Sequence, residues 1–370
     1  MQIAPDGRPP FRADHIGSLL RPAKLREAFK LHASGKLGNA EFGRIQDEAI
    51  RDAVALQEDA GLQVVTDGEF RRGSYWSRFV ELTDGLTVRE SLFRFRDEHG
   101  HESEYTTPHV AGRVKRGRPI TVGEFAFVKS ITRCTPKITM PSPSTMHFHR
   151  GSRYAEPGVY TDPRAFFVDL GRVYRQEIAE LAAAGCRYVQ LDEVAIAMLC
   201  DPHVREKVQA DGQDPEQLVE LYVDAINEAV KDRPAGIVVG VHVCRGNFKG
   251  KYLSEGGYDS VADKLFTRAD VNHFLLEYDT PRAGDFSPLR FMPSSKGVVL
   301  GLVSSKSPQL ESIDVLQRRA GEAAKFVDPA RLAISPQCGF ASTVGGNPVS
   351  ESDERAKLGL CVEAARRIWG

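Results

Sequence analysis

The chain has 370 residues, of which 41% are hydrophobic and 27% are charged, so it is long enough to bury a large core. Its 49 basic and 50 acidic residues give a net charge of -1, which disfavours a polyanion or a membrane surface as a partner and favours small-molecule substrates. Six cysteines are spread along the chain, unlike the dense cysteines of a small secreted scaffold. We therefore expect a cytoplasmic protein with reduced thiols that binds neither nucleic acid nor membranes. The sequence leaves open whether it forms a homo-oligomer.

Short β-branched runs alternate with stretches of helical periodicity, and this alternation indicates βα units around a parallel sheet. Eight segments are predicted to be strands: 13–17, 63–66, 137–140, 187–191, 237–241, 273–276, 298–303 and 332–335. The spacing of apolar residues predicts one helix over 42–60 and another over 167–181. Gly61 and Gly185 follow these helices, where a left-handed C-cap is expected. The pattern predicts an α/β fold, a (β/α)8 TIM barrel, with residues 1–370 in one domain.

The segment 83–125 interrupts the alternation with charged and aromatic residues, and we interpret it as a hairpin insertion after the second strand. Mixed basic and aromatic residues also occur on nucleic-acid-binding surfaces. Here, however, acidic residues such as Glu102 and Glu104 interleave with the basic ones, which favours a solvated hairpin over the barrel mouth. The chain has no Gly-x-Gly-x-x-Gly sequence after a strand and no Gly-Lys-Ser/Thr loop, so the usual dinucleotide and nucleoside triphosphate signatures are absent from it.

Polar residues follow the predicted strands, where barrel enzymes carry their catalytic groups. In chain order these candidates are Ile16, Gly17, Ser18, Asp67, Glu69, Asp192, Glu193, His242, Cys244, Glu277 and Cys338. Each also has a structural interpretation, because a lone cysteine or histidine is usually a core residue and carboxylates at strand ends often cap helices or pair with arginines. Their shared position at one end of the predicted barrel makes a functional site about as well supported as the structural interpretation.

Four of these candidates form a possible zinc site. His242 and Cys244 are two residues apart in a strand and so point to the same side, while Glu277 and Cys338 would reach the same ion from neighbouring strand ends. A carboxylate such as Glu277 is costly to bury without a partner or a metal. Two thiolates, an imidazole and a carboxylate suit zinc better than magnesium or calcium. Zinc in such a site makes an incoming thiol a thiolate, which points to sulfur alkylation.

Several motifs together resemble the catalytic barrel of cobalamin-independent methionine synthase, and most closely its short, single-barrel relatives. The matching motifs are Ile16-Gly17-Ser18, the run from Asp67 to Arg72, Leu191-Asp192-Glu193, His242-x-Cys244, Glu277 and Gln337-Cys338-Gly339. The resemblance implies that zinc is held by His242, Cys244, Glu277 and Cys338. It also implies that homocysteine is held by Ile16, Gly17, Ser18, Glu69 and Asp192. The implied activity is zinc-dependent methylation of homocysteine to methionine. We expect Glu277 to be the ligand that loosens, because two thiolates and one carboxylate already place three negative charges on a doubly charged ion.

Two departures from the resemblance concern the methyl donor. The apolar segment Ala195 to Met198 replaces a polar segment that contacts the pterin of methyltetrahydrofolate in the long enzymes of the family. Lys306 stands where the family has a proton-donating histidine, and we expect it to neutralise or protonate the leaving group. From these differences we expect weak or absent turnover with folate monoglutamate and better turnover with another donor, such as methylcobalamin or a small methyl compound.

Two other functions remain open at this point. Similar short barrels are related to epoxyalkane:coenzyme M transferases, but coenzyme M carries a sulfonate and no amine, so the two carboxylates Glu69 and Asp192 would repel it. A non-catalytic zinc-binding barrel that stores or senses metal is the other alternative. Both acidic residues favour an amino-acid thiol as the substrate.

Overall fold

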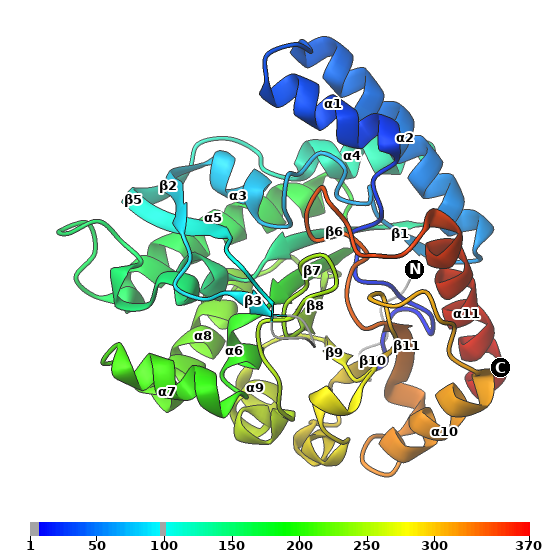
Figure 1. Ribbon diagram of the computed structural model, residues 1–370. Coiled ribbons are helices and arrows are strands. Elements are labelled where there is room, and N and C mark those ends of the chain that lie inside the picture. Colours follow the sequence, from blue (N-terminus) through cyan, green and yellow to red (C-terminus); the bar gives the residue numbers. More distant parts are fainter. Residues whose placement is uncertain (1–6, 97–100) are drawn as a thin grey trace.

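The computed structural model describes residues 7–96 and 101–370. Residues 1–6 of the predicted domain and 97–100 of the predicted insertion lie outside these described residues. Parallel strands form a curled sheet in the order β1-β6-β7-β8-β9-β10-β11, with helices packed around it (Figure 1). The strands are β1 Val64–Val65, β6 Thr135–Pro141, β7 Tyr188–Glu193, β8 Val238–Val243, β9 His273–Glu277, β10 Gly297–Val303 and β11 Leu332–Pro336. This arrangement confirms the predicted α/β barrel-type fold.

The first predicted strand, 13–17, is not a strand in the structure. Ala13 makes a single parallel bridge to Ile334 of β11, flanked by a 2.9 Å hydrogen bond from the Asp14 amide to the Ile334 carbonyl. The Asp14 side chain then accepts the amide of His15 at 2.7 Å, and Gly17 has a φ of 127°, which turns the chain out of strand geometry. The segment still connects the two ends of the sheet, because the Gly17 carbonyl accepts the Thr66 hydroxyl at 2.6 Å.

The two helices predicted from apolar spacing are present. The α-helices are α1 Ala23–Ala33, α2 Asn39–Asp59, α3 Ser77–Glu81, α4 Val122–Ile131, α5 Pro163–Ala183, α6 Ala195–Met198, α7 Pro202–Ala210, α8 Pro215–Val230, α9 Ala262–Arg268, α10 Ile313–Ala323 and α11 Glu351–Trp369. Ile45, Ala49 and Ala53 of α2 are buried, as their spacing predicts. Gly61 and Gly185 adopt φ values of 88° and 97° after α2 and α5, so both predicted left-handed caps are confirmed. None of the helices in the described part of the chain is long and apolar enough to cross a membrane.

The predicted insertion is built on a long antiparallel hairpin. Strand β2 (Thr83–Glu90) pairs with β5 (Thr106–Arg116), and between them β3 (Phe95–Arg96) pairs with β4 (Glu102–Ser103). Helix α4 begins at Val122, so the last residues of the predicted insertion already belong to a barrel helix. Phe93 and Phe95 are buried rather than solvated, and Phe93 stacks on Phe148 with ring centres 5.0 Å apart. The hairpin therefore packs these aromatic residues against the barrel, while Arg94, Glu102 and Glu104 stay exposed.

Candidate functional site

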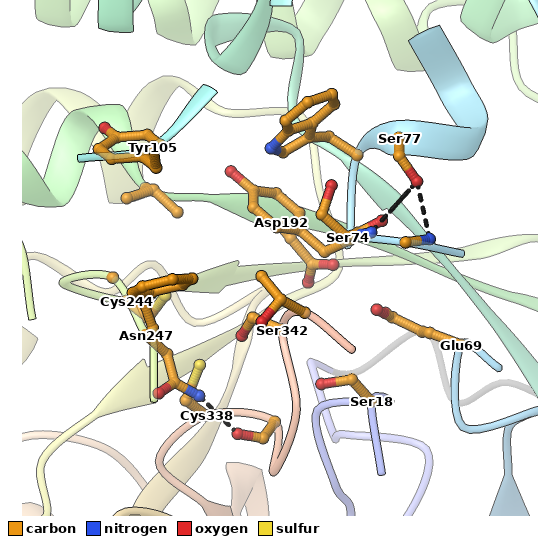
Figure 2. A pocket seen from close by; sticks show the side chains of 18 of the residues that line it. Ser18, Glu69, Ser74, Ser77, Tyr105, Asp192, Cys244, Asn247, Cys338 and Ser342 are labelled. Atoms are coloured by element: carbon orange, nitrogen blue, oxygen red, sulfur yellow. Dashed lines mark hydrogen bonds between the residues drawn. The ribbon is translucent and has the colours of Figure 1, made fainter. Parts of the chain in front are cut away.

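A cavity of about 600 Å³ opens at the carboxyl ends of the strands, between the sheet and the insertion. Its walls come from segments that are far apart in sequence, and Figure 2 shows Tyr105 of the insertion on the side opposite Cys338 and Ser18. Seven predicted site residues line the cavity: Ile16, Ser18, Glu69, Asp192, His242, Cys244 and Cys338. Gly17, Glu277 and Lys306 lie outside its described lining. The strand-end rule thus places most of the predicted residues in one cavity.

His242, Cys244 and Cys338 form a compact cluster in the cavity wall. One potential ligand atom from each lies within 4.8 Å of the other two, and all three residues are buried. The Nδ1 atom of His242 faces the Leu275 carbonyl at 3.1 Å, whereas its Nε2 atom is buried without a hydrogen-bond partner. Because a carbonyl can only accept, the proton of the neutral ring is on Nδ1, and the Nε2 lone pair is free for a metal. Histidines in protein zinc sites are commonly held in this way. The cluster fits a zinc ion by its geometry and by its ligand chemistry.

The two cysteines of the cluster influence each other's protonation. Contact with Cys244 lowers the pKa of the Cys338 thiol well below its usual range, and the same contact raises the pKa of Cys244. A thiolate is the form of cysteine that binds metals, so the cluster already favours one ligand in its binding form.

Glu277, the last residue of β9, lies next to the cluster but is held by other groups. Its two carboxylate oxygens accept the Arg245 amide at 2.9 Å and the Arg282 guanidinium at 3.2 Å. Burial raises the pKa of Glu277, but the positive charges of Lys306 and both arginines outweigh burial and lower this pKa to about 2. Glu277 is therefore a charged carboxylate beside the cluster, whose role as a ligand stays a prediction.

Lys306 lies beside the cavity without being one of its described lining residues. Its Nζ atom donates to the Gly246 carbonyl at 3.0 Å, and its charge acts on Glu277 and Cys338. These contacts give Lys306 an electrostatic influence on the cluster, and its predicted contact with the leaving group stays a prediction. Ala197 and Met198 of α6 are fully buried and are not among the described lining residues. They therefore give no reason to expect weak turnover with folate.

Glu69 and Asp192 bring two carboxylates to one side of the cavity (Figure 2). Burial and the charge of Glu69 raise the pKa of Asp192 to about 7, and burial also raises the pKa of Glu69 despite the nearby Arg72. The Glu69 Oε1 atom accepts the Thr139 hydroxyl at 2.7 Å, whereas its Oε2 atom is buried without a partner. Two buried carboxylates with an unpaired oxygen form a site that a substrate cation would stabilise.

The loop that carries Glu69 is held in an unusual conformation. Glu69 adopts a φ of 61°, a left-handed conformation that is costly for a residue with a side chain. The buried Arg21 guanidinium donates to the carbonyls of Glu69 and Arg72 at 2.9 and 2.8 Å, and also to the carbonyls of Ala341 and Thr343. Arg21 thereby joins the Glu69 loop to the segment after Cys338. Our sequence analysis did not identify Arg21, because its partners are backbone groups brought together only by the fold.

Gln190 is a second residue that our sequence analysis missed. Its amide nitrogen donates to the Asp192 carboxylate and to the Ile16 carbonyl, both at 2.7 Å. Its amide oxygen accepts Lys137 Nζ at 2.9 Å, and Lys137 in turn pairs with the buried Asp14 at 2.7 Å. Because lysine can only donate, this contact fixes which way the Gln190 amide points. The alternation of side chains in β7, which puts Gln190 and Asp192 on one face, is the sequence signal that could have identified it.

Ser18 occupies the other end of the predicted substrate site, against Gly339. A Cβ atom at position 339 would lie 1.9 Å from the Ser18 hydroxyl oxygen. The Gly339 backbone cannot easily move, because its carbonyl accepts Asn247 at 2.8 Å and Ser305 at 3.0 Å. Position 339 therefore requires glycine if the Ser18 hydroxyl is to point into the cavity.

We expect Gly339→Ala to displace the Ser18 hydroxyl and to raise the KM for an acceptor that carries a carboxylate by about fivefold, as for a lost hydrogen bond worth about 1 kcal/mol. Steady-state kinetics at fixed donor concentration would measure the change. Gly359→Ala is the matched control, since a Cβ at that position in α11 meets no atom within 4 Å. Equal acceptor KM values for both variants and the unchanged protein would contradict this role of Ser18.

The family model and the relatives that match this chain point to the same family. The family model described as the catalytic domain of cobalamin-independent synthase matches residues 11–367. The uncharacterized protein YxjH of Bacillus subtilis is 38% identical over 97% of this chain and 95% of its own length. A methionine synthase of Sulfolobus acidocaldarius is 28% identical over 88% of this chain and 84% of its own length.

Solved structures agree with these sequence matches. A candidate vitamin-B12-independent methionine synthase from Listeria monocytogenes has 30% identity and a TM-score of 0.76, and the match covers 99% of this chain and all of that one. A B12-independent methionine synthase from Shewanella, solved in complex with selenomethionine, has 23% identity and a TM-score of 0.75 over 96% of this chain and 97% of that one. At 23% identity, the likeness to the Shewanella structure supports the fold alone.

Proposed function

The chain belongs to the family of cobalamin-independent synthase catalytic domains, and from this membership we propose that it is a zinc-dependent methyltransferase that converts homocysteine to methionine. The family is one of methionine synthases, which supports an enzymatic role in methyl transfer. The observation that carries the finer proposal is the meeting of a His/Cys/Cys cluster and two buried carboxylates in one cavity. The cluster supplies metal ligands, and the carboxylates supply partners for an amino group.

The proposed metal site consists of His242, Cys244 and Cys338, with Glu277 as a fourth ligand. A zinc ion bound there would keep the acceptor sulfur deprotonated at neutral pH. Glu277 is the ligand that we expect to loosen when the acceptor binds. Its contacts with the Arg245 amide and Arg282 would hold the released carboxylate in its charged form.

The remaining residues would bind and orient the acceptor. Glu69 and Asp192 would bind its ammonium group through charge-assisted hydrogen bonds, and the backbone from Ile16 to Ser18 with the Ser18 hydroxyl would bind its carboxylate. Gln190 would keep Asp192 in place through its 2.7 Å hydrogen bond. These contacts fix both ends of an amino acid and leave its thiol directed to the cluster, which lowers the entropic cost of the reaction.

The charge of the cavity supports an amino-acid thiol over the alternatives. Glu69 and Asp192 would repel the sulfonate of coenzyme M, which has no amine to bind them. A cavity of about 600 Å³ beside the cluster supports a site that admits substrates over one that only stores metal. We therefore retain homocysteine as the proposed acceptor.

A direct assay tests the proposal. Purified, zinc-loaded protein is incubated with homocysteine and a panel of methyl donors, and methionine is measured by mass spectrometry. We expect methionine with at least one donor, and none after the metal is removed by a chelator. Methylation of coenzyme M or simple alkyl thiols without methylation of homocysteine would contradict the proposed acceptor.

A further inference from the structure

The cavity lining contains acidic side chains but, among the described residues, neither lysine nor arginine. The acidic side chains are Glu69, Glu81, Glu104 and Asp192. Three of them have cationic partners outside the lining: Arg94 contacts Glu104 at 2.7 Å, Arg72 lies 3.5 Å from Glu69, and Arg78 lies 3.9 Å from Glu81. These arginines offset the charge of the acids but are not lining residues themselves. A donor with carboxylates or phosphates would therefore meet no cationic side chain in the described lining.

Five aromatic side chains from three segments of the described chain line the cavity. Tyr75 and Trp76 come from the segment before α3, Phe95 and Tyr105 from the insertion, and Phe248 from the loop after β8. The ring centre of Phe95 lies 4.7 Å from that of Tyr105 and 5.2 Å from that of Phe248. Figure 2 shows Tyr105 on the side of the cavity opposite Cys338 and Ser18. The faces of such rings attract alkylated cations, which are weakly hydrated and need no anionic partner.

The cavity also lacks a well-placed acid among its described residues. His149 lines the cavity, but burial lowers its pKa to about 4, so it is neutral at physiological pH. Its Nδ1 atom already contacts the Tyr105 hydroxyl at 2.8 Å. Lys306 is not among the lining residues, and its Nζ atom is engaged by the carbonyl of Gly246, which does line the cavity. A leaving group that must be protonated, such as the amine of a tetrahydrofolate, is poorly served by this arrangement.

We propose that the methyl donor is a small methylsulfonium cation rather than an anionic methylfolate, an inference that rests on the proposed methylation of a thiol. The acceptor sulfur forms a bond to the methyl carbon with its own electron pair. The carbon–sulfur bond of the donor breaks, and its electron pair stays on the departing sulfur, which leaves as a neutral thioether. No proton, oxidant or reductant enters this step. A sulfonium is favoured over a quaternary ammonium because a thioether is the better leaving group.

Equilibrium binding tests whether the cavity recognises the positive charge of the donor and not only its shape. The probes are dimethyl(2-hydroxyethyl)sulfonium and its neutral isostere 3-methylbutan-1-ol, each titrated by calorimetry into the zinc-loaded protein. We expect the sulfonium to bind about tenfold more tightly, as aromatic rings discriminate for a desolvated cation. Phe95→Leu and Phe248→Leu should each reduce this preference. Phe93→Leu is the control, since Phe93 stacks on Phe148 outside the described lining and should leave the preference unchanged. Equal binding of the two probes would overturn the inference.

Methyl transfer provides the second measurement. S-methylmethionine, dimethyl(2-hydroxyethyl)sulfonium, choline and the mono- and triglutamate forms of methyltetrahydrofolate are compared with homocysteine as acceptor. Faster transfer from a sulfonium supports the inference, whereas faster transfer from choline or a folate overturns it. Transfer from a sulfonium to another thiol but not to homocysteine would support the donor inference and contradict the proposed acceptor. The two proposals can therefore fail separately.

Discussion

Replacing Cys244 or Cys338 by serine is expected to remove zinc from the protein and to abolish most of its methyl-transfer activity. A neutral hydroxyl is a poor substitute for a thiolate at zinc, and both sulfur atoms lie within 4.8 Å of the other potential ligands. We expect activity to fall by more than the roughly 10- to 100-fold that follows loss of a residue merely supporting a metal ligand. Elemental analysis after gentle chelation would measure the metal content.

Cys134→Ser is the matched control for this experiment. Cys134 is a free cysteine whose sulfur contacts the Leu62 carbonyl at 3.4 Å, outside the cluster. Its substitution should leave both zinc content and activity close to those of the unchanged protein. If Cys244→Ser and Cys338→Ser also retained full zinc, the cluster would not be the metal site.

Replacing Glu69 by glutamine or Asp192 by asparagine is expected to weaken binding of homocysteine while zinc stays bound. Each substitution removes a charge that would pair with the acceptor ammonium, and loss of such a hydrogen bond costs about 1.5 to 3 kcal/mol. The acceptor KM should rise by about 10- to 150-fold, which is the same free energy expressed as a ratio. Steady-state kinetics and elemental analysis of each variant would measure the two effects separately.

A thiol without the amine provides the control for these two variants. The compound is mercaptobutanoate with its thiol on the terminal carbon, which keeps the carboxylate and the thiol of homocysteine. Its reaction should change little in Glu69→Gln or Asp192→Asn. If both substitutions raised the KM for this amine-free thiol as much as the KM for homocysteine, the two acids would act on the cavity in general. The amino-group assignment would then be wrong.

The sequence predicted the parts of the site that depend on strand ends. His242, Cys244 and Cys338 could be placed because each ends or follows a buried apolar run, and parallel strands bring their carboxyl ends to one edge. Glu69 and Asp192 followed from the same rule. These predictions needed only local patterns and the fold class.

Other parts depend on tertiary contacts that local patterns do not contain. The segment 13–17 was predicted to be a strand. The Asp14 side chain instead accepts the His15 amide and Gly17 turns the chain, so regular pairing ends after one bridge. The aromatic lining of the cavity includes Phe95 and Tyr105, whose positions depend on the strand register of the hairpin. Lys306 was placed by its position in the chain alone, whereas the structure directs its Nζ atom to the Gly246 carbonyl.

X-ray absorption at the zinc edge, with and without homocysteine, would show whether the cluster activates the acceptor thiol. We expect zinc with sulfur ligands from Cys244 and Cys338, and one additional sulfur neighbour when homocysteine is added, with a weaker oxygen contribution as Glu277 loosens. Glu69→Gln should require more homocysteine to reach the same change. An unchanged number of sulfur neighbours at saturating homocysteine would contradict activation of the acceptor thiol at this cluster.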